Sequence, residues 1–389
     1  MDGGSRCCCS REQVLGVLTA IGSYLLEFSF GYSNTIGNLN TYLIQHLEVT
    51  TSESIWFLGS TIVAKSIFTP VGELISQWVP YVGLLFATVI FCSGGIFLTM
   101  WSVNNGMVAF LFTNSVLFGI GIGLSFTVTL KCTVAHYPQH SETVLQIEEQ
   151  SRVDALGFEN TKQNFKKVVK KPEMYILSVL NFLNVIPRMA IISTFKVYGQ
   201  AVGFDAISLV IVATLNGIFN CVGYVIARVA CSKASFKMPL ILFLLLITTL
   251  SGLFPLVKKV GLESFVLYVF CVFGLHFAMT AVNVVMTVAN NAAIVPLADF
   301  GTNLAFCFCS ASSAIIFSVI TSYQPIDRHY DIFFWFVASV GVLEIMLALT
   351  LQDMACPLKL MRGRFFASSK LEIKEADGQP EAGDGGTAS

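Results

Sequence analysis

Residues 131–174 read KCTVAHYPQHSETVLQIEEQSRVDALGFENTKQNFKKVVKKPEM, and this polar stretch divides the apolar part of the chain in two. The apolar segment 107–131 ends where the stretch begins, and apolar segments resume at Met174. The stretch is too polar to cross a bilayer and too short to fold as a domain. We therefore interpret it as a loop between two groups of membrane-spanning helices.

The composition places the rest of the chain in a lipid bilayer. Of its 389 residues, 54% are hydrophobic and only 12% are charged, whereas a soluble domain carries about 25% charged residues. No basic tract with interleaved aromatic residues is present, so nucleic acid is not an expected partner. No His/Cys cluster has zinc spacing, so we expect no metal site and no other cofactor. No nucleophile–base pair stands out, so we do not expect this protein to be an enzyme.

Ten segments reach the length of about 20 mostly apolar residues that a membrane span requires. Four precede the loop and six follow it, which predicts an all-α, polytopic helical bundle. The predicted spans are residues 14–35, 54–77, 80–100, 107–131, 174–196, 206–229, 238–257, 264–290, 301–323 and 331–352.

The distribution of lysine and arginine predicts the orientation of the bundle. Seventeen of the 23 Lys and Arg residues fall on the side of the two termini, and four fall in the opposite loops or span ends. Because cytoplasmic loops carry the excess of basic residues, we expect both termini in the cytoplasm. The expected parts are the N-terminus 1–13, a helical half 14–134, the loop 135–172, a second half 173–355 and a disordered tail 356–389.

Several short motifs go beyond a generic membrane protein. They include Gly37-Asn38-Leu39-Asn40-Thr41, Gly119-Ile120-Gly121-Ile122-Gly123, Asn216-Gly217-Ile218-Phe219-Asn220 and Phe300-Gly301-Thr302-Asn303-Leu304. In their order and spacing they resemble the oxalate/formate antiporter-like branch of the major facilitator superfamily, which lies near the monocarboxylate transporters. The resemblance covers residues 14–137 and 165–355.

This resemblance implies two six-helix halves around a central cavity. The four N-terminal spans resemble family helices one to four, and the six C-terminal spans resemble helices seven to twelve. Helices five and six have no counterpart, so the expected bundle has about ten helices, four plus six. Lipid, a second copy or a partner subunit must then fill the gap.

The resemblance also implies a function, which is transport of a small organic anion of the monocarboxylate type by alternating access. One departure concerns Tyr224, which stands where dicarboxylate carriers of the family have a cation. The alternative is a shortened isoform or degenerate paralogue without transport, acting as a membrane scaffold or not at all. Both the plasma membrane and an internal membrane fit these features.

Ionisable residues inside predicted spans are candidate functional residues, because a charge at mid-bilayer costs about 2.5–3.5 kcal/mol on insertion scales. Glu27, Lys65, Arg188 and His276 lie at similar depths, so they could meet in one layer. Glu27 and Lys65 fit either a structural ion pair or a coupling role. Glu344, in the last span, is expected to be structural.

Arg188 is the candidate partner for a substrate carboxylate, because a guanidinium pairs with that group through two hydrogen bonds. It follows Pro187, which can open the helix and free backbone carbonyls. The alternative for Arg188 is a paired or snorkelling arginine. His276 fits either a proton relay or a neutral histidine satisfied by a neighbour.

Polar and small residues complete the set of candidates. Asn216 and Asn220 are four residues apart and share one helix face, where they could line a path or join helices. The glycines at 119, 121 and 123 indicate close helix packing, since no strand precedes them as in a nucleotide loop. The run Cys7, Cys8 and Cys9 before the first span is a candidate for palmitoylation.

Overall fold

The computed structural model describes residues 18, 21–22, 25–26, 31–126, 172–233, 235–260, 264–294 and 300–351. Its regular elements in these ranges are helices. Before the gap they are α2 (Tyr32–His46), α3 (Thr51–Ile75), α4 (Tyr81–Ser102), η1 (Val103–Asn105), α5 (Met107–Phe110) and the π-helical η2 (Leu111–Leu117). After it come α9 (Pro172–Val202), α10 (Ala206–Lys233), α11 (Lys237–Leu253), η4 (Phe254–Lys259), α12 (Ser264–Ile294), α13 (Phe300–Ser322), η6 (Ile326–Arg328) and α14 (Tyr330–Thr350).

Nine helices in this described part of the chain are long and apolar enough to cross a membrane. They correspond to the second to tenth predicted spans, so the predicted all-α membrane bundle is confirmed and the chain is a multi-pass membrane protein. Most of the first predicted span, with Glu27, lies outside the described residues. So do Cys7, Cys8 and Cys9 and the loop at 135–171, and the absence of a helix pair at that loop stays a prediction.

Helical structure at the predicted end of the first span continues beyond residue 35. The chain is helical from Tyr32 to His46, although residues 34–41 are rich in Asn and Thr and look like a loop. Asn40 is fully buried and Thr41 is only 4% exposed. These polar residues continue a helix because another helix, α9, covers them, and a sequence pattern does not show that contact.

The start of α3 is set by local chemistry. The Thr50 side chain accepts a hydrogen bond from the Glu53 N–H, and the Glu53 carboxylate accepts one from the Thr50 N–H. This reciprocal capping satisfies two N–H groups that a helix start leaves unpaired. It places the first residue of α3 at Thr51, three residues before the predicted start.

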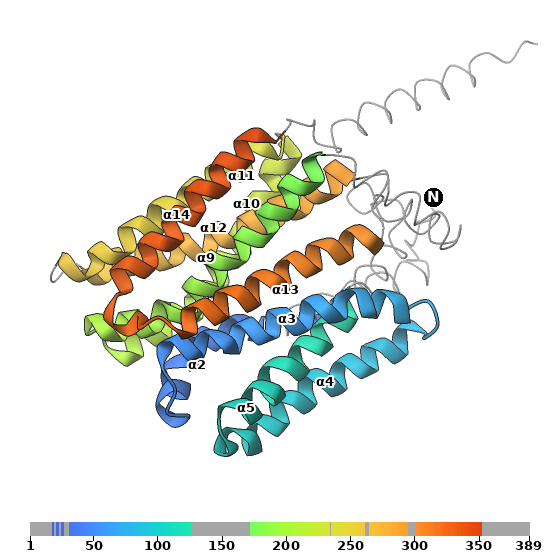
Figure 1. Cartoon of the computed structure of the whole chain (residues 1–389), viewed down its shortest axis with the longest axis horizontal. Coiled ribbons are helices and arrows are strands. Elements are labelled where there is room, and N and C mark those ends of the chain that lie inside the picture. The colour runs from blue at the N-terminus through green and yellow to red at the C-terminus, as the bar shows by residue number, and fades with distance from the viewer. Residues whose placement is uncertain are drawn as a thin grey trace, which may run out of the picture.

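The described helices form two groups that meet along α3 and α13, with α9 at the centre (Figure 1). The first group holds α2 to η2 and the second holds α9 to α14. We call the end at which α3, α10, α12 and α14 begin the distal end, and the opposite end the proximal end. At the distal end Ser52 donates to the Gln324 carbonyl, and at the proximal end Lys237 donates to the Leu351 carbonyl at 2.6 Å.

The predicted role of the glycines in the fourth span is confirmed. A Cβ on Gly119 would lie 2.7 Å from the Thr61 carbonyl oxygen, and one on Gly123 would lie 2.8 Å from the Lys65 carbonyl oxygen. Gly121 faces α4, where a Cβ would meet Cys92. The helix therefore packs backbone to backbone against α3 on one side and against α4 on the other.

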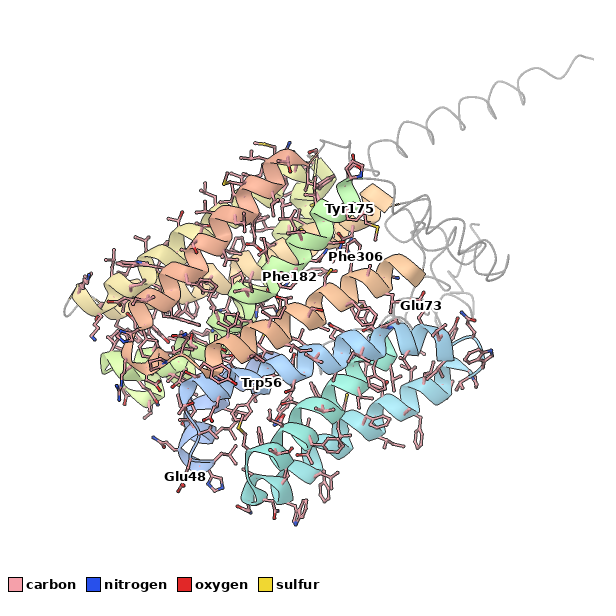
Figure 2. All side chains as sticks on the ribbon, viewed as in Figure 1. Glu48, Trp56, Glu73, Tyr175, Phe182 and Phe306 are labelled. Carbon is pink, nitrogen blue, oxygen red and sulfur yellow. The ribbon has the colours of Figure 1, made fainter. Side chains whose placement is uncertain are left out.

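Aromatic side chains fill the distal part of the second group. The rings of Phe254 and Phe334 pack with centroids 4.7 Å apart, and Tyr198 lies 5.0 Å from Phe254. Between the groups, the labelled Trp56 side chain of α3 (Figure 2) donates from Nε1 to the Ser322 hydroxyl at 2.9 Å. The distal end thus combines an aromatic core with polar bonds that join the two groups.

Candidate functional site

A stripe of polar side chains runs along one face of α12. The residues are spaced alternately by four and three positions, so they share one side of the helix. We call this stripe and its partners on α9 and α10 the polar seam. Its members on α12 are His276, Thr280, Asn283, Thr287 and Asn290.

The distal half of the polar seam joins α12 to α10. The Asn216 Nδ2 lies 3.5 Å from the His276 Nε2, and the Thr280 hydroxyl donates to the Asn220 Oδ1 at 2.9 Å. The prediction that Asn216 and Asn220 share a functional face is consistent with this placement. Both asparagines form a hydrogen bond to the neighbouring helix α12. This arrangement agrees with the alternative in which they join helices.

The proximal half of the polar seam joins α12 to α9. The Asn184 Nδ2 donates to the Asn283 Oδ1 at 2.8 Å, and the Asn181 Nδ2 lies 3.4 Å from the Asn290 Oδ1. In a bilayer such amide pairs replace water that the surroundings cannot supply. Together with the bonds of the distal half, they join α9 and α10 to α12.

His276 fits the neutral alternative. It is 4% exposed, and its Nδ1 lies 2.9 Å from the Val272 carbonyl oxygen. A carbonyl only accepts, so we assign the ring proton to Nδ1, which leaves Nε2 to accept from the Asn216 amide. Phe195 closes one edge of the ring at 5.3 Å between centroids. A histidine satisfied in this way favours a structural role over a proton relay.

Arg188 lies one turn after Asn184 on the same face of α9 and is half-buried. Within the described residues, its guanidinium has no hydrogen-bond or ion-pair partner. The helix runs unbroken from Pro172 to Val202, so Pro187 does not open it as expected. Proline lacks an N–H, and only the carbonyl four residues earlier loses its helical partner. The guanidinium N–H donors of Arg188 are therefore available to a ligand beside the polar seam.

The expected layer of four charges stays a prediction, because Glu27 falls outside the described residues. The Lys65 ammonium lies 4.9 Å from the Phe126 ring centroid. Tyr224 is 47% exposed and accepts a hydrogen bond from Arg228 at 3.2 Å. It stands apart from the seam.

Lys196 was not predicted from the sequence as a candidate functional residue. Its position near the end of a predicted span suggested an exposed lysine, but α9 extends to Val202 and the residue is fully buried. Its ammonium donates to the backbone and side-chain oxygens of Asn38 at 2.7 and 2.8 Å. The length of α9 and the contact with α2 decide this placement, and a hydropathy count shows neither.

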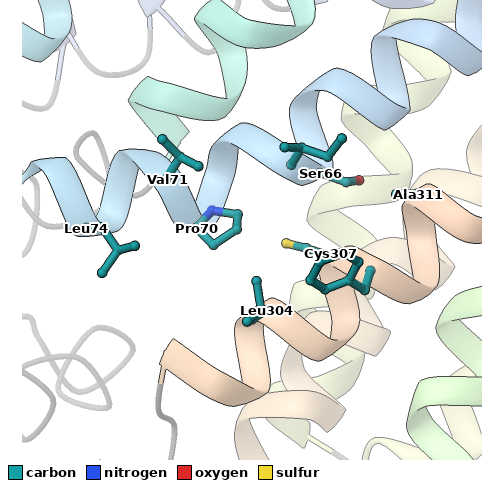
Figure 3. Close-up of a pocket in the computed structure, with 9 residues that line it drawn as sticks. Ser66, Pro70, Val71, Leu74, Leu304, Cys307 and Ala311 are labelled. Atoms are coloured by element: carbon teal, nitrogen blue, oxygen red, sulfur yellow. The ribbon is translucent and has the colours of Figure 1, made fainter. Parts of the chain in front are cut away.

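A separate pocket of about 190 Å³ lies between α3 and α13 (Figure 3). Its wall is almost wholly apolar, with Pro70, Leu74, Leu304 and Cys307 among the lining residues. No charged side chain lines it. A polar or anionic ligand would lose its hydration there without gaining partners. The polar seam and Arg188 are therefore the candidate functional site. Among the described residues, no group of three His, Cys, Asp or Glu side chains is arranged to hold a metal ion.

The arrangement of helices has counterparts among solved structures. The crystal structure of a D-xylose-proton symporter superposes with a TM-score of 0.59 at 13% identity, over 87% of this chain and 98% of that one. The xylose transporter XylE from E. coli, in a partially occluded inward-open conformation, gives a TM-score of 0.58 at 14% identity, over 88% and 98%. No protein-family model and no curated protein sequence matches the chain.

These likenesses define the class of the fold. The chain has the helical-bundle fold of the major facilitator transporters, as the resemblance implied. At this level of identity the likeness is one of fold alone, and membership of the superfamily stays a prediction. Membership of the oxalate/formate antiporter-like branch stays a prediction.

Proposed function

We propose that this protein is a secondary transporter that carries a small monocarboxylate anion across a membrane by alternating access. The observation that carries the proposal is Arg188. It is a half-buried arginine near the middle of a membrane span without a partner among the described residues. Such a charge is costly in a bilayer unless a ligand or water pairs with it. A carboxylate matches its donors in number and geometry.

The surroundings of Arg188 support the same substrate class. The neighbouring amides of the polar seam are already paired with one another, as Asn184 is with Asn283. They orient the site and leave the guanidinium as its main recognition group. Both similar structures are titled as xylose carriers. A neutral sugar is therefore the competing substrate, and it would need the amides that the seam already uses.

The orientation and the organisation in halves belong to the same proposal. With both termini in the cytoplasm, the distal end faces away from the cytoplasm. The groups α2 to η2 and α9 to α14 are then the two rocking halves, and the polar seam lies on the inner face of the second. A partner or a second copy would complete the first half if its fifth and sixth helices are absent. The alternative is a shortened form that binds without transporting.

Ligand-induced stabilisation of the purified protein in nanodiscs tests the substrate class. We expect pyruvate to raise the unfolding temperature and xylose to leave it unchanged, because a ligand stabilises the state that binds it. Arg188→Gln should lose most of the pyruvate effect. Arg328→Gln, an exposed arginine at the distal end, should keep it. Stabilisation by xylose, or equal stabilisation of Arg188→Gln and the parent protein by pyruvate, would contradict the assignment.

A further inference from the structure

Lys196 lies where the two groups of helices meet at the distal end. Its side chain is fully buried between α9 and α2. The ammonium donates to the Asn38 backbone oxygen at 2.7 Å and to the Asn38 Oδ1 at 2.8 Å, and it lies 4.5 Å from the centroid of the Tyr42 ring. All these partners belong to α2, so the lysine of one group is held entirely by the other.

The partners of Lys196 are neutral. No Asp or Glu in the described ranges forms an ion pair with it. Removing an ammonium from water costs several kcal/mol. Two hydrogen bonds from the charged group and an aromatic face offset only part of this cost. Lys196 is therefore a buried cation whose full counter-charge is missing in this conformation.

Three polar atoms next to Lys196 are also unsatisfied. The Ser193 Oγ, the Asn40 Oδ1 and the Thr41 Oγ1 are buried and have no hydrogen-bond partner within the part of the chain that the structure describes. Ser193 lies one turn before Lys196 on α9, and its carbonyl accepts from the Asn40 Nδ2 at 2.7 Å. Buried polar groups nearly always have a hydrogen-bond partner. Three unsatisfied oxygens next to one buried ammonium therefore indicate that these atoms have partners in another conformation.

The contact that hides these groups belongs to a closed distal end. A Cβ on Gly37 would lie 1.9 Å from the Ile192 carbonyl oxygen, so α2 and α9 touch backbone to backbone. Ser52 and Trp56 bond to the end of α13 at the same level. A carrier that alternates its access must separate these helices, and Lys196 and Ser193 would then lose Asn38 and Asn40.

We propose that Lys196 and Ser193, with Asn40, form a second anion-binding site that Asn38 masks while the distal end is closed. The ligand is a small carboxylate, and this inference rests on the proposed transport of such an anion. The site is distinct from Arg188, which lies eight residues away on α9, about 12 Å along the helix axis. When the helices separate, the carboxylate replaces the Asn38 oxygens on the ammonium and accepts a hydrogen bond from Ser193.

The exchange of partners couples ligand binding to opening. A carboxylate binds Lys196 only when Asn38 has left, so it favours the open distal end by its differential affinity for that state. Asn38 and the anion compete for one ammonium. Lys196 therefore admits anions from the distal side and lets the gate close again once the anion has moved on toward Arg188.

Labelling of a buried reporter tests this coupling. Ser52, which is 3% exposed and bonds across the distal closure, is replaced by cysteine in nanodisc-embedded protein. The rate of its reaction with a soluble maleimide is read by peptide mass spectrometry. We expect saturating pyruvate to raise this rate about tenfold and xylose to leave it unchanged, since the rate follows the population of the open state.

Variants separate the two anion sites. Lys196→Met should lower the basal rate, because it removes the buried charge that disfavours the closed state, and it should abolish the pyruvate response. Arg188→Gln should keep the response. Lys258→Met, an exposed lysine at the same end, is the matched control and should behave as the parent protein. The native Cys271, fully buried in α12, should stay unlabelled in each folded variant.

Three results would overturn the second site. They are a pyruvate response that survives in Lys196→Met, a response that Arg188→Gln abolishes, and a basal rate that Lys196→Met raises. A complete lack of response in the parent protein would overturn it as well. In each case the Arg188-dependent stabilisation by pyruvate, measured separately, shows whether the proposed function still stands.

Discussion

Arg188, Lys196 and Glu344 are three ionisable residues inside helices, and their surroundings differ. Arg188 is half-buried without a partner among the described residues, and Lys196 is fully buried against neutral groups of α2. Glu344 is fully buried in α14, and neither of its carboxyl oxygens has a hydrogen-bond partner in the described part of the chain. The sequence shows that such residues lie within predicted spans, but only the packing of helices separates a recognition group from a structural one.

Replacing Arg188 by lysine tests whether its geometry matters as well as its charge. Lysine keeps the positive charge but lacks the planar fork that binds a carboxylate through two hydrogen bonds. We expect Arg188→Lys to raise the half-saturating pyruvate concentration about tenfold, equivalent to about 1.4 kcal/mol. The measurement is a pyruvate titration of the unfolding temperature. An unchanged half-saturating concentration would show that pyruvate binding depends only on the positive charge at this position.

Replacing Glu344 by leucine tests the expectation that this carboxyl is structural. An unsatisfied buried polar group costs about 1–3 kcal/mol. We expect Glu344→Leu to raise the free energy of unfolding and to leave pyruvate binding intact, as measured by thermal unfolding with and without ligand. Lower stability would mean that Glu344 has a favourable partner, and lost binding would place it in the coupling mechanism.

At the scale of elements, α2 and α9 contain the features that hydropathy did not predict. Hydropathy gave nine of the described spans within a few residues, because long apolar runs determine them. It did not give the helix at 36–46, where Asn40 and Thr41 are buried by a helix far away in sequence. It also placed Lys196 at a surface for the same reason. Contacts between distant segments decide these cases.

The contact between α2 and α9 can be tested at Gly37. A Cβ there would lie 1.9 Å from a backbone oxygen, which cannot move as a flexible side chain does. We expect Gly37→Ala to push the helices apart, to destabilise the protein by about 1–3 kcal/mol and to speed labelling of the Ser52→Cys reporter. Gly217→Ala is the matched control, because nothing lies within 4 Å of its Cβ. Equal behaviour of the two variants would contradict the close contact.

A double-mutant cycle tests the polar seam between α9 and α12. The Asn184 Nδ2 and the Asn283 Oδ1 are 2.8 Å apart, and hydrogen bonds between membrane helices contribute on average about 0.6 kcal/mol. We expect Asn184→Leu and Asn283→Leu to be less destabilising together than the sum of the two, by about 0.6–1.7 kcal/mol. Unfolding of the four proteins in one detergent gives this coupling energy. Strict additivity would contradict the bond.

At the scale of the whole molecule, the fold combines the polar seam with a distal closure. The polar seam and Arg188 lie within the second group of helices, and the bonds of Ser52, Trp56 and Lys196 close the distal end between the groups. Composition and basic-residue counts predicted a membrane bundle and an orientation, and short motifs predicted the fold class. The polar seam could be predicted only in part, because spacing shows which residues share a face of α12 but not which helix they meet.

The most direct test is uptake of labelled pyruvate by proteoliposomes that contain the full chain. We expect saturable uptake above protein-free liposomes, a reduction of at least about tenfold in Arg188→Gln, which a loss of about 1.4 kcal/mol produces, and no change in Arg328→Gln. Pyruvate binding without uptake would favour the shortened, non-transporting form. Absence of saturable uptake, or equal uptake by Arg188→Gln, would contradict the proposal that this chain transports a monocarboxylate through Arg188.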